Sequence, residues 1–336
     1  MANQWTLSDA WDWYNHQPWL VGCNFIPSTA INQLEMWQIE TFDLETIDNE
    51  LGWAASLGFN TIRVYLHDLI WENNPDGYRD RIDQLLKVAS SYHIRTIFVI
   101  FDDCWNSEFA LGTQPAPKPG VHNSGWVQSP GVKIANRPLE WGRLQRYVKG
   151  LLTTFRHDFR ILMWDLYNEP GNSQQGEKSL PLLQAAFEWA WSVRPSQPLT
   201  AGMWCDNKVL NEYQISACDV ITFHNYGPTG SLENQIYHLS HSERPSICTE
   251  YMARPAGSCF ETHLPIFKRE RVGCLNWGLV AGKTNTIFAW NTPLDTPEPP
   301  LWFHDIFRKD GTPYRQDEVD YIRQMTRDKL SNIFSK

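Results

Sequence analysis

The chain has 336 residues, of which 42% are hydrophobic and 20% charged, so it can bury a large core and is not disordered by composition. Its formal net charge of −9 argues against a general binder of nucleic acids or anionic membranes, because both partners repel an acidic surface. Seventeen Trp residues raise the expectation of carbohydrate binding, since flat aromatic rings pack well against the apolar faces of sugars.

Short apolar runs recur along the chain and predict strands buried on both faces. The eight predicted strands are 20–25, 60–66, 95–101, 161–167, 198–204, 219–224, 245–251 and 273–279. Amphipathic stretches between them predict helices at 43–57, 79–92, 139–157, 179–194, 231–242, 259–271 and from about Asp317 onward, with 205–218 the weakest. Alternating strands and helices favour a parallel sheet, and eight units favour closure into a single-domain α/β (β/α)₈ TIM barrel over 1–336.

Two connections are long. The connection 102–138, after the third strand, is rich in Pro, Gly and Ser, and the connection 280–304, after the eighth strand, is rich in Pro. Both follow strands, so both belong at the carboxyl end of the barrel, where active sites are built. Their aromatic residues are expected to form walls of a binding cleft; they are Trp105, Phe109, Trp126, Trp290 and Trp302.

Two glutamates stand at predicted strand ends. Glu169 lies in WDLYNEP (164–170) at the end of the fourth strand, and Glu250 lies in ICTEYM (247–252) at the end of the seventh. These strands lie across a barrel from each other, so the two carboxyl groups can face one substrate. Hydrolysis of a glycoside needs such a pair, one protonated and one ionised, and retention of configuration requires them about 5–5.5 Å apart. A single glutamate at a strand end is more often a salt bridge or a cap, but the pair favours catalysis.

Other residues at strand ends predict a supporting role around this pair. Arg63 lies inside an apolar strand and needs a buried acidic partner, for which Glu250 is the natural candidate; a structural ion pair with another acid is the alternative. His224 and Tyr226 end the sixth strand, where the imidazole could orient Glu169 and the hydroxyl could bind Glu250. Trp277 ends the eighth strand, as a floor for the sugar or as core packing.

Asp102, Asp103 and Trp105 follow the third strand in FDDCW (101–105). The two aspartates are candidates for binding sugar hydroxyls, binding a cation or capping the loop, and the sequence does not rank these roles. No HExxH or close His/Cys cluster predicts a metal site, no GxSxG predicts a serine nucleophile, and no GxGxxG follows the first strand.

Together these motifs resemble glycoside hydrolase family 5 and its clan A relatives, in order along most of the chain. The resemblance is carried by LGFNTIRVYL, WDLYNEP, HNY, TEY and NWGL. It implies double-displacement hydrolysis with retention, no cofactor, Glu169 as acid/base, Glu250 as nucleophile and Asn168 on the 2-hydroxyl of the reacting sugar. Many members carry a His near the end of the third strand, where this sequence has FDDCW, so this part of the sugar site is expected to be built differently.

Two other classes stay open at this point: a non-catalytic carbohydrate-binding barrel, and an enzyme of another class, such as a metal-dependent aldolase, on the same fold. The N-terminus has no charged segment followed by an apolar one, which predicts a cytoplasmic protein, although a secreted chain trimmed of its signal peptide would look the same. No run predicts a membrane span. Seven cysteines without CxxC spacing predict free, mostly buried thiols. Sugar, linkage, endo or exo action and oligomeric state do not follow from the sequence.

Overall fold

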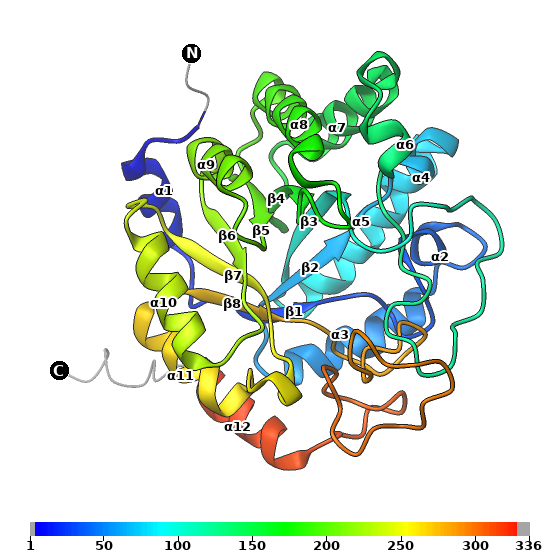
Figure 1. Ribbon diagram of the computed structural model, residues 1–336, viewed down its shortest axis with the longest axis vertical. Helices are drawn as coiled ribbons and strands as arrows, with labels where there is room; N and C mark the ends of the chain where they lie inside the picture. Colours follow the sequence, from blue (N-terminus) through cyan, green and yellow to red (C-terminus); the bar gives the residue numbers. More distant parts are fainter. Residues whose placement is uncertain (1–3, 328–336) are drawn as a thin grey trace.

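The computed structural model describes residues 4–327 and contains a closed barrel of eight parallel strands in the order of the chain (Figure 1). The strands are β1 (Val21–Asn24), β2 (Thr61–Tyr65), β3 (Arg95–Asp102), β4 (Ile161–Asn168), β5 (Leu199–Met203), β6 (Ile221–His224), β7 (Ser246–Tyr251) and β8 (Gly273–Asn276). All eight predicted strands are confirmed, with ends that differ by up to three residues. Nearly every strand residue is buried, as expected where one face packs in the barrel and the other against helices.

Helices surround the barrel (Figure 1). The helices with predicted counterparts are α3 (Leu44–Ser56), α5 (Pro75–Ser91), α7 (Gly142–Thr154), α8 (Leu180–Val193), α9 (Lys208–Ala217), α10 (Thr229–Ser240), α11 (Phe260–Glu270) and α12 (Gln316–Thr326). Four short helices were not predicted: α1 (Leu7–Asn15), α2 (Gln33–Trp37), α4 (Asp68–Asn73) and α6 (Val132–Ala135). Three of them span six residues or fewer, too few for an apolar periodicity to stand out.

The amino end of the barrel is closed by α1. The Tyr14 hydroxyl donates to the Arg271 carbonyl oxygen at 2.8 Å and accepts from the Gly273 amide at 2.9 Å, which ties α1 to the start of β8. Tyr14 also joins a buried apolar cluster formed by residues near the strand starts, among them Ile97, Leu162 and Ile247. This end is therefore solid core, and the carboxyl end remains for function.

The two long connections lie on the same side of the barrel mouth (Figure 1). They contact each other through backbone hydrogen bonds, from the Asn123 amide to the Thr284 carbonyl oxygen at 2.8 Å and from the Asp295 amide to the Pro119 carbonyl oxygen at 2.9 Å. The first connection also contains α6 and a 3₁₀ turn at Pro138–Glu140. Both connections are thus built into the fold.

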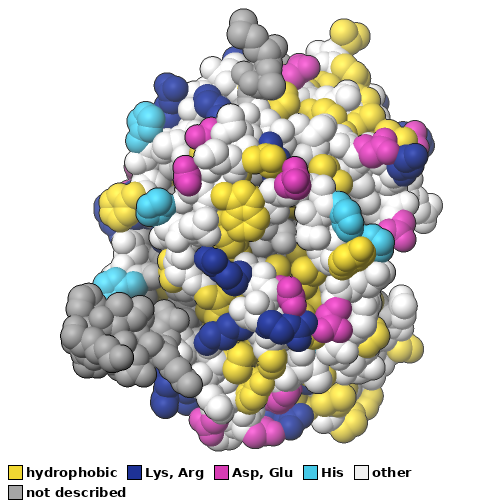
Figure 2. Space-filling model, turned by 90° about the vertical axis from the view of Figure 1, so that its left-hand side faces the viewer, with side chains coloured by type: hydrophobic (Ala, Val, Ile, Leu, Met, Phe, Trp, Pro, Cys, Tyr) yellow, Lys and Arg dark blue, Asp and Glu magenta, His cyan; other side chains and the backbone are white. Residues whose placement is uncertain are grey.

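The outer surface of the side that carries α1 and α10 has acidic and basic side chains interspersed with hydrophobic ones (Figure 2). Within the described residues, no helix is long and apolar enough to cross a bilayer. The seven cysteines are free, and Cys205 and Cys259 alone among them are partly exposed, which confirms the expectation from their spacing.

Candidate active site

A cavity of about 620 Å³ opens at the carboxyl end of the barrel. Eight of its lining residues stand at or directly after strand ends: Cys104, Asn168, Glu169, Trp204, His224, Tyr226, Glu250 and Trp277. The sheet register places their strands level, since Asp102 pairs with Asn168 across β3 and β4, and His224 with Glu250 across β6 and β7. The barrel therefore gathers side chains far apart in sequence into one layer at the mouth.

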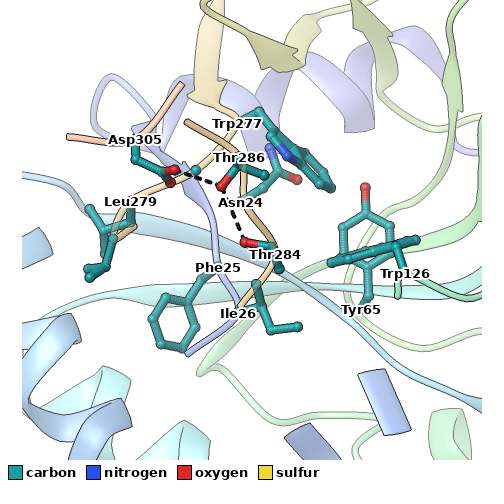
Figure 3. Close-up of a pocket in the computed structure, with 12 residues that line it drawn as sticks. Asn24, Phe25, Ile26, Tyr65, Trp126, Trp277, Leu279, Thr284, Thr286 and Asp305 are labelled. Carbon is teal, nitrogen blue, oxygen red and sulfur yellow. Dashed lines mark hydrogen bonds between the residues drawn. The ribbon is translucent and has the colours of Figure 1, made fainter. Parts of the chain in front are cut away.

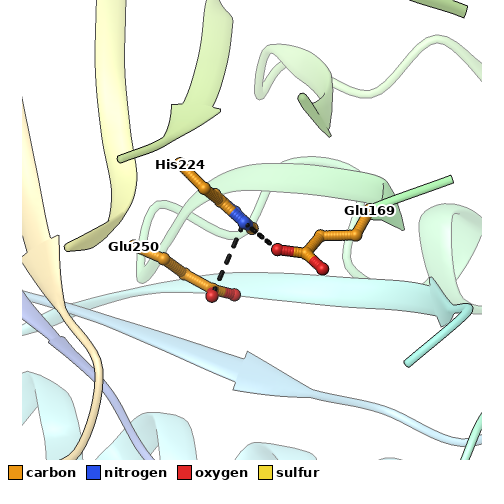
Figure 4. Close-up of side chains that lie close together, drawn as sticks. All are labelled: Glu169, His224 and Glu250. Carbon is orange, nitrogen blue, oxygen red and sulfur yellow. Dashed lines mark hydrogen bonds and ion pairs between the residues drawn. The ribbon is translucent and has the colours of Figure 1, made fainter. Parts of the chain in front are cut away.

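Glu169 and Glu250 face each other across His224 (Figure 4). The His224 Nδ1 atom lies 2.6 Å from Oε1 of Glu169 and 3.5 Å from Oε2 of Glu250. One oxygen of each glutamate and a ring nitrogen of His224 all lie within 4.8 Å of one another. The two carboxyl groups are therefore close enough to contact the same small substrate.

Three strong donors hold Glu250. Its Oε1 accepts from Arg63 Nη1 at 2.9 Å and from the Tyr65 hydroxyl at 2.7 Å, while Oε2 accepts from the Tyr226 hydroxyl at 2.7 Å. Burial is the main reason that the pKa values of Tyr65 and Tyr226 lie well above their ordinary value, so both hydroxyls keep the protons that they donate. The predicted pairing of Arg63 and Tyr226 with Glu250 is present in the structure.

Arg63 is fully buried beneath the cavity and is shared between two acids. Its Nε and Nη2 donate to Oδ2 of Asp165 at 3.0 and 2.8 Å, and Nη2 also donates to Oδ1 of Asn168 at 2.7 Å. The alternative of an ion pair with another acid is thus realised together with the pair to Glu250. Arg63 does not line the cavity, so any contact of Arg63 with a substrate stays a prediction, while its hydrogen bonds position Glu250 and Asn168.

Glu169 has weaker and more changeable partners. Besides His224, its Oε2 accepts from the Asn172 amide at 2.5 Å and from the Cys104 thiol at 3.2 Å. Burial raises the pKa of Glu169, but the hydrogen bond and charge of His224, followed by Cys104 and Asn172, outweigh it and hold the pKa below its ordinary value. The backbone of Glu169 has φ of 45°, in the left-handed region that non-glycine residues avoid. This turn directs the side chain into the mouth.

Asp102 and Asp103 do not line the cavity, which favours a role in the loops over direct contact with a sugar. Asp102 accepts from Asn168 Nδ2 at 2.9 Å and from the Trp126 indole at 2.8 Å. Asp103 accepts from the Tyr167 hydroxyl at 2.7 Å and from the Gly171 amide at 2.9 Å. Burial raises the pKa of Asp102 to about 7 and that of Asp103 to about 6. Both aspartates brace the loops beside the site, the capping role among the three that the sequence left open.

Tryptophans shape the cavity as the loop aromatics predict, with two exceptions. Trp105, Trp126 and Trp290 line it, together with Trp277 and with Trp204, whose role the sequence did not reveal. Phe109 lies outside it, edge-on to the ring of His67. Trp302 is buried and stacks on Tyr314 with ring centroids 4.3 Å apart. For these two residues the expectation of a cleft wall is wrong, because their rings pack on His67 and Tyr314, away from the cavity.

Sequence reasoning missed Tyr65, Cys104 and Asn172, each of which contacts a candidate catalytic carboxylate. Tyr65 carried a signal, because it lies two residues after Arg63 and so on the same face of β2. Cys104 and Asn172 lie in loops, where no periodicity places a side chain.

A cation could also be considered between Glu169, His224 and Glu250, the one such group found among residues 4–327. However, a 2.6 Å bond between His224 Nδ1 and the Glu169 carboxylate needs a proton on that nitrogen or on that oxygen. That proton lies on one of the atoms between which an ion would sit if His224 bound it through Nδ1. The geometry fits a shared proton better than an ion.

No protein-family model matches the sequence, and no curated protein matches it. Solved structures do match. A variant of GH5_18 from Streptomyces cattleya in complex with Manβ1-4GlcNAc has a TM-score of 0.63 at 13% identity, over 94% of this chain and 82% of that one. The exo-β-1,4-mannosidase from Opitutaceae bacterium strain TAV5 has a TM-score of 0.62 at 16% identity, and the match covers 91% of this chain and 59% of that one. The endo-β-1,4-mannanase from Thermotoga petrophila has a TM-score of 0.60 at 14% identity, and the match covers 93% of this chain and 77% of that one.

The chain thus has the fold of these enzymes. They include glycoside hydrolases of family 5, and the resemblance carried by the sequence motifs is confirmed at the level of the fold. At such low identity the likeness establishes the barrel, and the chemistry has to be argued from the site itself.

Proposed function

We propose that the protein is a retaining β-glycoside hydrolase, with Glu169 as acid/base and Glu250 as nucleophile. The observation that carries the proposal is the pair of buried carboxyl groups facing each other across one cavity, with oxygen atoms within 4.8 Å. The donors around each glutamate, and the glycoside hydrolases that share the fold, support it. The solved structures described above that name a sugar substrate or ligand name β-mannosidic ones, so β-mannosides are the first substrates to test.

In the first step, an oxygen of Glu250 attacks the anomeric carbon, and the bond from that carbon to the leaving oxygen breaks. Glu169 gives that oxygen a proton, drawn from the one that it shares with His224, and the leaving sugar departs as an alcohol. The product is a glycosyl ester of Glu250 with inverted configuration. The developing positive charge of the sugar lies beside two carboxyl groups, which stabilise it.

In the second step, Glu169 accepts a proton from water as the oxygen of that water attacks the anomeric carbon. The ester bond to Glu250 breaks, the carboxylate is restored and the second inversion gives net retention. Arg63, Tyr65 and Tyr226 bind the carboxylate of Glu250 before and after the reaction. Because these donors are already fixed in place, they do not have to reorient as the charge on Glu250 changes, as water molecules would.

The decisive experiment replaces the nucleophile. In Glu250→Ala, hydrolysis of aryl β-glycosides is expected to fall at least ~10⁴-fold, and sodium azide is expected to restore part of it as an α-glycosyl azide. The panel comprises aryl β-mannoside, glucoside, xyloside, galactoside and fucoside. Glu261→Ala, which removes an exposed glutamate, is the matched control and should keep full activity.

Normal turnover by Glu250→Ala would disprove the assignment of the nucleophile. Loss of wild-type activity on incubation with EDTA would instead favour a metal enzyme at the Glu169–His224–Glu250 group. Sugar binding by the wild-type protein without turnover on any glycoside would favour the non-catalytic barrel.

A further inference from the structure

We propose that the cavity is closed on the glycone side and accepts one neutral β-linked sugar. This sugar is the non-reducing end of a short oligosaccharide, and the remaining units of that oligosaccharide extend out of the cavity beside the ends of β4 and β5. The protein would thus release single sugars from chain ends. This inference rests on the proposed function and specifies its substrate class.

The two glutamates set the direction of the substrate. The acid/base must touch the glycosidic oxygen, so the leaving part of the substrate lies on the side of Glu169. The reacting sugar ring then lies between Glu250 and Trp277 and extends away from Glu169. What stands beyond Trp277 decides whether further sugars fit there.

A lower wall of aromatic rings stands at that place. The same rings help to line a separate pocket (Figure 3), whose volume of about 20 Å³ is too small for a sugar ring. Trp126 comes from the loop after β3, and Trp277 follows β8; their ring centroids are 5.4 Å apart at 64°. The ring of Tyr65 lies 4.9 Å from Trp126 and 5.8 Å from Trp277. The three rings are buried and close the barrel mouth above β1 and β2.

An upper wall continues the enclosure. Trp105 packs against His122 with centroids 5.6 Å apart, and His122 against His304 at 5.3 Å. His304 reaches Tyr226 at 5.5 Å, and Tyr226 reaches Trp290 at 5.0 Å. The chain of rings runs from the end of β3, over both long loops, to the end of β6. These rings come from the two long loops and the end of β6, and none of them comes from the ends of β4 or β5.

Hydrogen bonds lock the two loops that carry this wall. His122 Nδ1 lies 2.7 Å from the Phe288 carbonyl oxygen, and the Asn123 amide donates to Thr284. Below them, the Thr286 hydroxyl donates to Asp305 at 2.7 Å and lies 3.2 Å from the Thr284 hydroxyl (Figure 3). Such a wall cannot yield to a second sugar without breaking buried hydrogen bonds.

On the side of β4 and β5 a single aromatic ring lines the cavity, although Trp105 and Trp290 of the upper wall are exposed to a similar extent, 38% and 40%. This side is lined by Asn172 and Ser173 after β4 and by Trp204 after β5. Trp204 is 37% exposed, and its indole donates to the Pro170 carbonyl oxygen at 3.2 Å, which fixes the ring beside the acid/base. An exposed, fixed indole is a stacking surface for the first sugar of the leaving chain.

The walls also carry no fixed positive charge. None of the residues that line the cavity is Lys or Arg. Burial lowers the pKa of His122 to about 4 and that of His304 well below its ordinary value, so both rings are neutral near pH 7. The cation beneath the cavity, Arg63, is already paired with Asp165 and Glu250, so a sugar acid would meet two carboxyl groups without a free cation, which favours a neutral glycone.

The test compares two labelled chains. The first is β-1,4-mannopentaose with a fluorophore at its reducing end; the second is the same pentaose capped at the non-reducing end by a 4-O-methyl group. We expect the labelled tetraose as the first labelled product of the free chain, with mannose released. The capped chain should react at least ~100-fold more slowly. Cellopentaose replaces mannopentaose if the aryl panel identifies glucose.

A wall variant sharpens the result. Trp290→Ala removes part of the upper wall and is expected to raise the rate on the capped chain relative to the free one at least ~5-fold. Trp11→Ala removes a similarly exposed indole from α1 and should leave this ratio unchanged.

Early release of labelled biose or triose, or equal rates on free and capped chains, would overturn the closed glycone side while leaving the hydrolase assignment intact. Hydrolysis of an aryl monosaccharide glycoside, without cleavage of either pentaose, would support the closed side and limit the substrate to shorter chains. Failure on every aryl glycoside as well would overturn both proposals.

Discussion

The two halves of the site hold their carboxyl groups in opposite ways. Glu250 is the last-but-one residue of β7 and accepts from a buried guanidinium and two tyrosine hydroxyls, all of which stand on or directly after strands. Glu169 follows β4 in a left-handed turn and is bound by an imidazole, a loop amide and a thiol. Glu250 has a charged donor and two tyrosine donors, whereas Glu169 has two neutral donors and an imidazole that can exchange a proton with it.

This difference matches the two tasks of the proposed mechanism. A nucleophile has to be an anion at a fixed place, which the rigid sheet and the charge of Arg63 supply. An acid/base has to lose and regain a proton in each cycle, which needs a neighbour that can share one. We expect substitutions on the two sides to differ in kind as well as in size.

Among the residues that hold the two carboxyl groups, the largest effect is expected from Arg63→Met. It leaves Glu250 and Asp165 without their shared buried cation, so the free energy of unfolding should fall by about 3–5 kcal/mol. Loss of a fixed donor at the reacting charge should lower kcat/KM about 10²–10³-fold, for good and poor leaving groups alike. Chemical denaturation and steady-state kinetics on two aryl glycosides measure both.

Arg194→Met is the matched control. Arg194 pairs with buried Asp219 at 2.8 Å, just before β6, at the closed end of the barrel. It should lose stability as well but keep kcat/KM within about twofold. If Arg63→Met does not fold, Arg63→Lys keeps the charge and tests the geometry. Full activity in either Arg63 variant would show that the guanidinium serves the fold alone.

The intermediate effect is expected from His224→Ala. Burial raises the pKa of Glu169 and His224 lowers it, so removing the imidazole should raise this pKa. The carboxyl group would then keep its proton to higher pH. A ¹³C NMR titration of labelled glutamate side chains, with the Glu169 signal assigned by its loss in Glu169→Gln, measures the change.

His224→Gln can still donate to Glu169 but carries no charge, so its pKa should lie between those of the wild type and His224→Ala. Equal values in all three proteins would mean that the two groups do not share a proton, and the acid step would need another source.

The barrel and the central residues of the site could be predicted because they follow from periodic strands. Buried runs end at Glu169, His224 and Glu250, and a barrel brings strand ends together wherever they lie in the sequence. Arg63 was found because a charge in an apolar strand demands a partner. Physical rules of this kind act locally and need no knowledge of the loops.

The features of the site that could not be predicted depend on parts of the chain in which no periodic pattern of apolar residues places the side chains. The second acid bound to Arg63, Asp165, looked like one more residue of a strand. Asp102 and Asp103 carried charges beside the site, but only the folded loops reveal that Trp126 and Tyr167 occupy their oxygens. The ring-to-ring wall depends on contacts between two loops some 160 residues apart, as in the pair of His122 and Phe288.

The smallest effect is expected from Cys104, which is the weakest donor to Glu169. Its Sγ lies 3.2 Å from Oε2 of Glu169, and burial, followed by the charges of nearby acids, raises its pKa well above the ordinary value. The thiol therefore stays protonated near neutral pH and donates. A net hydrogen bond is worth about 0.5–1.5 kcal/mol, so Cys104→Ala should lower kcat about 2–10-fold.

Because Cys104 acts through the acid/base, the loss should depend on the leaving group. Cys104→Ala should slow a glycoside with a poor leaving group, such as a methyl β-glycoside, and barely change a dinitrophenyl glycoside, which departs without a proton. Cys104→Ser restores a hydroxyl donor and should recover the rate. Equal slowing of both substrates, without recovery in Cys104→Ser, would instead make the thiol a packing residue between Asn168 and Trp126 and leave Glu169 to His224 and Asn172.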